Sequence, residues 1–398
     1  MNIPKLKIER FQLLFYVFIC LFLGLFFTVE TVNGKLWTND FVVYYGAVQD
    51  FFNGNDPYVT NYGLDTGYFK YPPFTLYLFG YNFWLPFPVA KIVHLVLSSF
   101  ALLYSIPVLA AMIREMLGIR RNYAWVLYLG FFSVAIHLVR EFHMGNVNLI
   151  LLGLFVYGLS HLKSTTVWYT VISWSLMIII KPITIVALFP LLFFRQWKYV
   201  FYSGLCGIFF FLFPLVHLGW DAGIKLWSDW LTAVSGHGEY IVGYNSLRFL
   251  ALTYFGVSSE WGPSLIFLSV LLLLMLVDVS KHNHQRQLFR WMVVFMAFVP
   301  NFFVTDTQHF LLSVPLILFL IYELITRRSV VAWSVFVLGF GLFSLNSNDL
   351  LGSHISDFMY IKGMLGIGNL LFIGLYIFVF MSNEKRSRVS QVVTFGSI

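Results

Sequence analysis

Three short segments of an otherwise apolar chain carry polar and ionisable side chains close together. The first runs from Asp40 to Pro73, the second from Arg140 to Asn148 and the third from Asp306 to His309. A carboxylate can take a proton from an acceptor hydroxyl, while lysine, arginine and histidine side chains can neutralise a phosphate leaving group. The residue types therefore suit transfer of a group from a lipid-linked phosphate.

The start of the first segment has the spacing of a short helix. Asp40 and Tyr44 are four residues apart, which places them near one face, and the run from Asn53 to Pro57 is a stop and turn. Asp40 falls in the first turn, where a carboxylate is either an N-cap that complements the helix dipole or a catalytic base. Asp56 precedes a proline, which is ordinary turn chemistry. We expect the following residues to line a substrate cavity: Tyr44, Tyr45, Asp56 and Tyr58.

The end of the first segment reads Lys70-Tyr71-Pro72-Pro73. Paired prolines fix an extended entry into an apolar stretch and so hold Lys70 and Tyr71 at the membrane boundary. Two interpretations stay open for the pair. They either bind substrate, or form a snorkelling lysine beside an interfacial tyrosine.

The second and third segments lie at the outer ends of apolar stretches, where polar side chains are costly unless they bind something or one another. Asn146 and Asn148 could make interhelical hydrogen bonds, and Arg140 with Glu141 could be an interfacial pair. His309 arrives with three polar neighbours at a tight turn, and we expect it to contact a ligand. Further candidates for a substrate-binding role are Arg140, His143, Asn146, Asn148, Lys181, Asn245, Arg248, Asp306 and Gln308.

The composition requires that these side chains be positioned by a membrane-embedded helical bundle. With 59% hydrophobic and 11% charged residues over 398 positions, the chain cannot form a soluble globule with a wetted surface. Apolar windows of about 20 residues, enough to cross about 30 Å of hydrocarbon, recur along its whole length. We predict an all-α polytopic membrane protein made of one integral domain, residues 1–398.

The predicted bundle has about twelve transmembrane helices, within a range of ten to thirteen because prolines interrupt several apolar stretches. Two large outer loops connect them, 30–89 with juxtamembrane helices and 218–262, and residues 71–84 suit an interfacial or re-entrant helix. The predicted spans are 11–29, 90–113, 122–139, 146–162, 166–180, 182–195, 199–217, 263–280, 289–305, 308–326, 329–345 and 363–381.

The charge distribution predicts that both termini are cytoplasmic. If the basic N-terminal end is inside, 17 of the 25 basic residues fall on that side and 13 of the 18 acidic residues fall outside. Lysine and arginine in short loops collect on the cytoplasmic side. The net charge of +7 is thus a topology signal, and no nucleic-acid partner is needed to explain it.

Six motifs resemble, in the same order, those of glycosyltransferase family 87. They are Asp40-Phe-x-Val-Tyr44-Tyr45, Gly54-Asn-Asp56-Pro57-Tyr58, Lys70-Tyr71-Pro72-Pro73, Gly145-Asn146-Val-Asn148, Lys181-Pro182 and Asp306-Thr-Gln-His309. The family's members are polytopic GT-C-type enzymes, similar to bacterial mannosyltransferases that use polyprenyl-phosphate-mannose and build membrane glycolipids.

The resemblance implies a hexose transfer, with mannose expected, from a polyprenyl-phosphate donor to a lipid or glycan acceptor at the extracytoplasmic face of a bacterial plasma membrane. It also implies inversion, with Asp40 as general base, and a role for His309 in binding the donor phosphate or assisting proton transfer. Neither a metal nor a cofactor is implied. The partners expected are the donor, the acceptor and membrane lipids.

Two other functional classes remain open from the sequence. A secondary transporter or lipid flippase would also have broken helices and buried polar groups, but we would expect internal repeats and ionisable residues near the midplane. A catalytically inactive lipid-binding subunit would not need both Asp40 and His309.

Overall fold

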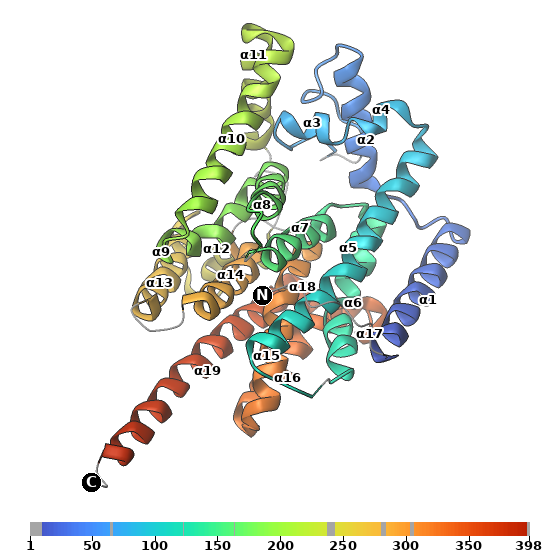
Figure 1. Cartoon of the computed structure of the whole chain (residues 1–398). Coiled ribbons are helices and arrows are strands. Elements are labelled where there is room, and N and C mark those ends of the chain that lie inside the picture. Colours follow the sequence, from blue (N-terminus) through green and yellow to red (C-terminus); the bar gives the residue numbers. More distant parts are fainter. Residues whose placement is uncertain are drawn as a thin grey trace.

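The computed structural model describes residues 10–63, 67–121, 123–162, 164–236, 243–279, 284–302 and 306–395. Within these ranges the chain is built of helices, and its one β-type pairing is an isolated bridge between Asn61 and Tyr68 (Figure 1). The helices are α1 (Arg10–Val32), α2 (Asn39–Phe52), α3 (Phe74–Leu78), α4 (Tyr81–Trp84), α5 (Phe87–Met116), α6 (Trp125–Met144), α7 (Asn148–Ser160), α8 (Trp168–Ile180), η1 (Pro182–Leu188), α9 (Phe189–Phe193), α10 (Trp197–Leu218), α11 (Trp220–Ser235), α12 (Leu247–Phe255), α13 (Gly262–Val279), α14 (His284–Phe302), η3 (Thr307–Ser313), α15 (Val314–Arg327), α16 (Val330–Ser344), α17 (Asn348–Leu351), α18 (Ser353–Ile361) and α19 (Met364–Phe395).

Each predicted span overlaps one or two helical elements, and the all-α membrane architecture is confirmed. Positions 122, 280 and 303–305 of the predicted spans lie outside the described residues. In the described part of the chain, six helices are long and apolar enough to cross a membrane, or seven if the bent pair of α18 and α19 counts as one span. Four further apolar helices are shorter, between 10 and 17 residues. The predicted number of about twelve crossings is therefore not confirmed.

The centre of the bundle is the continuous run of η3 and α15. Within its most apolar window, 83% of the residues are buried inside the protein, against 22% for α10 and 28% for α1. Leu316, Ile317 and Leu320 have no exposed surface. A helix that is apolar all round and covered by protein belongs in a core, whereas apolar helices left exposed on one side suit a lipid environment.

The predicted first outer loop folds as helices, but differently from the expectation at its end. The short helix expected at Asp40 is present as α2. Residues 71–84 form two short helices, α3 and α4, instead of one interfacial or re-entrant helix. At Gly80, between the two helices, the backbone nitrogen bonds to the carbonyl three residues before it and not to the one four residues before it.

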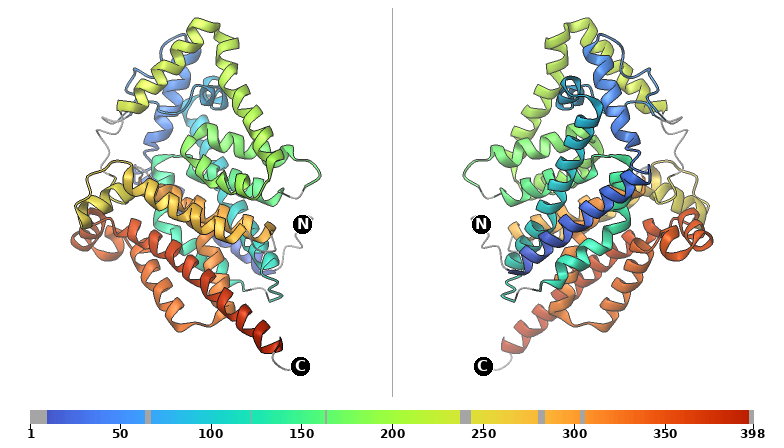
Figure 2. Two further views of the ribbon diagram at one scale, coloured as in Figure 1. Left: turned by 90° about the vertical axis from the view of Figure 1, so that its left-hand side faces the viewer. Right: turned by 90° about the vertical axis from the view of Figure 1, so that its right-hand side faces the viewer.

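A cap over one end of the bundle combines this first loop with the α10–α11 hairpin. Figure 2 shows α11 turning back from the end of α10 and descending beside α2. The aromatic ring of Phe74 on α3 packs against Phe210 on α10 with centroids 4.3 Å apart. The second predicted outer loop thus contains α11 and α12, while its residues 237–242 lie outside the described part, as do Lys5 and Lys7 of the N-terminal basic end.

Two local breaks bring the cavity-facing ends of distant helices together. Gly145 ends α6 in the left-handed region, with φ of 63°, which glycine adopts at no steric cost. Lys181 has an extended backbone, with φ of −133° and ψ of 96°, where α8 stops before Pro182. A residue that precedes proline is disfavoured in the α region, so the Lys181-Pro182 pair forces this interruption.

Candidate active site

The first turn of α2 rests on the turn between α6 and α7. The backbone nitrogen of Thr38 donates to the carbonyl oxygen of His143 at 2.7 Å. A Cβ atom placed on Gly145 would lie 2.9 Å from Cβ of Phe41, so only a glycine leaves room for this approach. The contact places Asp40 directly over the segment that carries Asn146 and Asn148.

Asp40 is engaged by another helix and does not cap its own. Its Oδ2 atom accepts a hydrogen bond from Nδ2 of Asn146 at 2.5 Å. The N-cap residue of α2 is Thr38, and no side chain caps the helix. The N-cap alternative for Asp40 is therefore not what the structure shows. No hydrogen bond from the described residues reaches its second oxygen, Oδ1.

Lys181 links three side chains across the break between α8 and η1. Its Nζ atom donates to Oδ1 of Asn148 at 2.8 Å and to Oδ1 of Asn146 at 3.3 Å. Nζ also lies 2.6 Å from Nε2 of His309. An ammonium group has three donors and no acceptor, and these three acceptors match them.

His309 follows Asp306 in the first turn of η3, and its ring is held from both sides. Because the Lys181 ammonium can only donate, Nε2 of His309 accepts, and the ring proton of the neutral imidazole is on Nδ1. Nδ1 lies 3.2 Å from the carbonyl oxygen of Asp306, to which it donates. The backbone N–H of Asp306 also points at Nδ1, at 3.0 Å, and donates to it in the other tautomer, in which the ring proton is on Nε2 and the contact completes a capping box at the start of η3.

One cavity of about 480 Å³ is bordered by Asp40, Asn146, Lys181, Asp306 and His309. Its wall includes apolar residues such as Val43 and Ile183, together with Trp230 and Val234 from α11. Among the described residues, no three His, Cys, Asp or Glu side chains are grouped so as to hold a metal ion. The predicted site residues that line the cavity are Asp40, Tyr44, Lys70, Tyr71, Asn146, Lys181, Asp306 and His309.

Burial and neighbouring charges shift the pKa values of Asp40 and Lys70, two ionisable residues of the first loop that line the cavity. Burial raises the pKa of the Asp40 carboxyl to about 6; Asp306 adds to the rise, while Asn146 and the two lysines oppose it. Burial lowers the pKa of the Lys70 ammonium to about 8, and the carboxylates of Asp40 and Asp306 partly offset that effect. Near neutral pH the cavity thus contains a carboxylate of raised basicity and a lysine that keeps its charge.

Tyr44 and Tyr71 form a hydroxyl pair in the cavity wall. Their oxygens are 2.8 Å apart, and their rings meet edge to face with centroids 5.1 Å apart. Tyr58 lies behind this pair and donates to the backbone oxygen of Tyr71 at 2.8 Å. Tyr58 therefore supports Tyr71. It was predicted to line the cavity, but it does not.

Tyr45 and Asp56 also lie away from the cavity that they were predicted to line. The hydroxyl of Tyr45 donates to the carbonyl oxygen of Leu85 at 3.2 Å, on the far side of α2. Asp56 forms the expected turn, accepting from the backbone nitrogen of Tyr58 at 2.9 Å. Successive residues of a helix point about 100° apart, so Tyr45 cannot share the direction of Tyr44.

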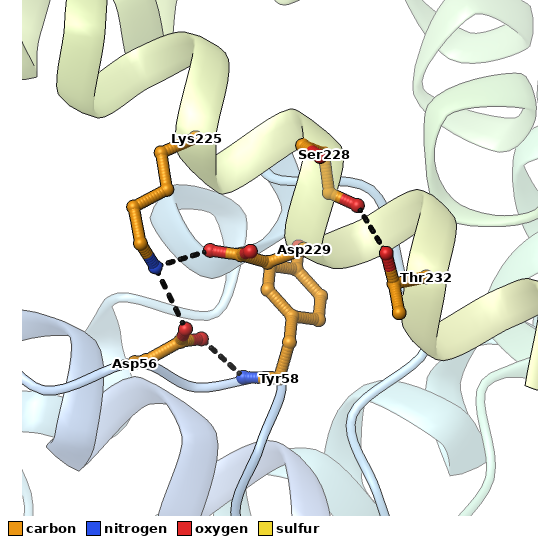
Figure 3. A network of polar contacts seen from close by, with 6 residues as sticks. All are labelled: Asp56, Tyr58, Lys225, Ser228, Asp229 and Thr232. Atoms are coloured by element: carbon orange, nitrogen blue, oxygen red, sulfur yellow. Dashed lines mark hydrogen bonds and ion pairs between the residues drawn. The ribbon is translucent and has the colours of Figure 1, made fainter.

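Asp56 ties the first loop to α11 instead (Figure 3). Nζ of Lys225 lies 3.2 Å from Oδ2 of Asp56 and 2.7 Å from Oδ2 of Asp229. One turn further along α11, Nε1 of Trp230 donates to the backbone oxygen of Lys70 at 3.0 Å. The helix and the loop are thus joined at two points on one side of the cavity.

In the second segment, Arg140 to Asn148, Asn146 lines the cavity, and the other predicted residues lie behind or outside it. Asn148 is fully buried one layer behind Lys181. His143 lies outside the cavity, where Nε2 is 2.8 Å from Oε2 of Glu30 and so attaches α6 to the end of α1. Arg140 is exposed and does not line the cavity.

Three other predicted substrate-binding residues have structural partners elsewhere. Asn245 accepts from the backbone nitrogen of Gly366 at 3.1 Å and so connects the second outer loop to α19. Arg248 pairs with Glu260 at 2.9 Å near the surface. Gln308 is buried beside Asp306, with Nε2 3.4 Å from Oδ2 of that residue. None of the three lines the cavity.

Sequence reasoning missed several contributors to the site, among them Trp230 and Glu141. Trp230 was considered only as one of the many aromatic residues, since nothing in the sequence shows that α11 folds back over the first loop. Glu141 was paired with Arg140, yet it is 1% exposed and bonded to Asn148. The available signal was its position in helix α6, where it points about 100° away from the neighbouring Arg140 and so does not share its direction.

Comparison with known proteins gives one family match, which covers the chain from the end of the first outer loop to α16. Residues 69–345, more than half of the chain, match glycosyltransferase family 87. A comparison with curated proteins gave no match. Asp40 precedes the matched range, while the cavity residues from Lys70 to His309 fall inside it. The chain belongs to glycosyltransferase family 87 and is a membrane enzyme that transfers sugars.

Proposed function

We propose that the enzyme transfers a hexose, mannose in the first instance, from a polyprenyl-phosphate donor to a hydroxyl of a lipid or glycan acceptor. The reaction takes place at the extracytoplasmic face of a bacterial plasma membrane, with both termini of the chain cytoplasmic. The observation that carries the proposal is the presence of Asp40, Lys70 and Lys181 in the wall of one cavity.

Asp40 is the general base in this proposal. One carboxylate oxygen is held by Asn146 at 2.5 Å, and the other takes the proton from the acceptor hydroxyl. The acceptor oxygen then forms a bond to the anomeric carbon of the sugar while the bond from that carbon to the phosphate oxygen breaks. Attack on the face opposite to the leaving group inverts the anomeric configuration.

The cations of the cavity stabilise the leaving group. Polyprenyl phosphate departs as an anion, and Lys70 and Lys181 lie where they can neutralise the charge that develops on its oxygens. His309 orients Lys181 through the 2.6 Å contact between Nε2 and Nζ. The apolar wall formed by Val43, Ile183 and Val234 faces the first part of the polyprenyl chain.

The test is the variant Asp40→Asn in reconstituted membranes, assayed with a panel of polyprenyl-phosphate hexoses. The asparagine can still accept from Asn146 but cannot take a proton, so transfer should fall by a factor of about 100 or more. Asp56→Asn is the matched control, because it lies in the same loop and keeps its turn bond. Full activity of Asp40→Asn would sink the base assignment, and no transfer by the wild type from any donor of the panel would refute the donor class.

A further inference from the structure

Glu141 is a buried carboxylate beneath the cavity to which the proposed mechanism gives no role. It lies near the end of α6, is 1% exposed and does not line the cavity. Its Oε1 atom accepts from the backbone nitrogen of Leu149 at 2.9 Å, and its Oε2 atom accepts from Nδ2 of Asn148 at 2.8 Å. Both oxygens therefore face N–H donors at the start of α7.

The bond to Glu141 determines which way the amide of Asn148 points. A carboxylate only accepts, so the NH₂ group of Asn148 must face Glu141 and its oxygen must face the other way. That oxygen, Oδ1, lies 2.8 Å from Nζ of Lys181. If the amide were turned over, its NH₂ group would face the Lys181 ammonium, and two groups that only donate would be in contact.

The amide of Asn146 is fixed by the same chain of donors. Its Oδ1 atom accepts from the backbone nitrogen of Val147 at 2.7 Å, from Nδ2 of Asn148 at 3.1 Å and from Nζ of Lys181 at 3.3 Å. Because three donors face the oxygen of Asn146, its NH₂ group must point in the opposite direction. There it donates to Oδ2 of Asp40.

We infer that Glu141 is a positioning residue: it sets the donor and acceptor directions of Asn148 and Asn146, and through them holds Lys181 and Asp40 in place. The effect passes from a carboxylate outside the cavity to the two cavity residues that are proposed to act on acceptor and phosphate. This inference rests on the proposed function for its kinetic consequences, but its structural part does not depend on the donor.

The variant Glu141→Gln tests the direction of these bonds at nearly constant shape. A glutamine offers one oxygen and one NH₂ group to two N–H donors. The oxygen stays with the fixed backbone of Leu149, and the NH₂ group then meets that of Asn148, which must turn over against Lys181. We expect kcat to fall by a factor of about 100, as a small misplacement of reacting groups can cause. The bond from Asn146 lowers the pKa of Asp40, so its loss should raise that pKa. The fall in activity at low pH should therefore begin at a higher pH than in the wild type.

A second substitution should restore the order of donors and acceptors. In Glu141→Gln with Asn148→Asp, the glutamine donates to the new carboxylate, which accepts from Lys181, and the total charge of the site is unchanged. The oxygen of Asn146 loses its bond from residue 148 but keeps its donors from Val147 and Lys181, so the restoration is partial. We expect the double variant to recover at least about tenfold in kcat over Glu141→Gln, since each restored bond involves a charged group. A double variant no more active than the single one, with both folded, would overturn the inference, as would wild-type kinetics of Glu141→Gln.

If Glu141→Gln does not fold, the variant Asn148→Ala tests whether the connection from Glu141 to Lys181 is needed for activity. It removes the connection between Glu141 and Lys181 but leaves the bond from Leu149 to Glu141 that begins α7. A loss of kcat similar to that expected for Glu141→Gln supports the inference. Wild-type kcat in a folded Asn148→Ala protein rejects it.

A spectroscopic measurement separates this inference from the proposed function. Infrared difference spectra recorded through a pH titration report protonation of Asp40, whose band is identified by its absence in Asp40→Asn. The midpoint should rise in Glu141→Gln and Asn148→Ala and return in the double variant, whether or not the tested donors are substrates. An unchanged midpoint in both single variants contradicts the role of Glu141, whereas lack of turnover by the wild type contradicts only the proposed donor.

Discussion

Asp40 and Asn146 are 106 residues apart in the chain, and their side chains meet at 2.5 Å. The contact joins the first turn of α2 to the turn after α6, which are also held together by the backbone bond from Thr38 to His143 and by the packing of Gly145 against Phe41. A charge-assisted bond of this kind stabilises the ionised carboxylate and fixes its direction. The position of Asp40, the candidate base, is therefore set jointly by α2 and by the turn that follows α6.

The pH dependence of kcat/KM should be bell-shaped, with limbs near pH 6 and pH 8. Asp40 must be ionised to act as a base, and its pKa is raised to about 6, so activity should fall as the pH drops through that value. Lys70 must be charged to stabilise phosphate, and its pKa is lowered to about 8, so activity should fall as the pH rises through that value. Initial rates at low donor concentration between pH 5 and 9.5 measure both limbs.

Lys70→Arg provides the control for the alkaline limb. Arginine stays charged across this range, so the variant should lose the fall near pH 8 and retain the one near pH 6. An alkaline limb that persists in Lys70→Arg would assign it to another group.

Gly145→Ala should weaken the attachment of α2 to the bundle. The new Cβ would be 2.9 Å from Cβ of Phe41 at a backbone φ of +63°, and we expect a loss of about 2 kcal/mol in stability with a large loss of transfer. Gly54→Ala is the matched control, because Gly54 also has a positive φ, +84°, but open space around it. Thermal unfolding in detergent and transfer assays compare the two, and equal effects would show that only backbone strain matters.

His309→Ala should raise the apparent KM for the donor, lower kcat, or both. The substitution removes the acceptor that lies 2.6 Å from Nζ of Lys181 and leaves that lysine free to turn away from the phosphate position. His217→Ala is a suitable control, since His217 contacts Tyr77 at the surface, at 3.0 Å, away from the cavity. Kinetics of His309→Ala that match the wild type would remove the residue from the site.

The proposed topology predicts opposite labelling of two exposed positions. In a protein without Cys20 and Cys206, Asn55→Cys should react with a membrane-impermeant maleimide added to intact cells. Lys198→Cys, at the other end of the bundle, should react only after permeabilisation. Labelling of both positions in intact cells would refute cytoplasmic placement of the basic loops.

The helical framework could be predicted because apolar runs of about 20 residues leave few alternatives in a membrane. Three residues of the candidate site could be predicted for a related reason: Asn146, Lys181 and His309 interrupt or end such runs, where a polar side chain must have a partner. Asp40 lies in the first outer loop and was predicted from its helical spacing to Tyr44. What the sequence did not reveal was the direction of side chains around each helix axis at these ends. Arg140 and Glu141 are adjacent, yet one is exposed and the other is buried under the cavity.

Residues in the outer loops were the least predictable. Asn245 and Arg248 resemble Asn146 and Lys181 in residue type, but Asn245, in the turn before α12, is bonded to Gly366, and Arg248 on α12 is paired with Glu260. Trp230 enters the site because α11 folds back and donates to the backbone of Lys70. Such contacts depend on the tertiary arrangement of segments that are 160 residues apart in the chain, which local patterns do not encode.

The contact between Lys181 and His309 has a consequence for turnover under the proposed function. A phosphate that binds Lys181 must compete with the imidazole for the same ammonium protons, so each binding event breaks an internal bond and each departure re-forms it. The imidazole keeps Lys181 in the direction from which it meets the donor, and the re-formed bond offsets part of the free energy needed to release the spent lipid phosphate. An enzyme with such a built-in competitor sheds its lipid product more readily, which matters where product release limits the rate.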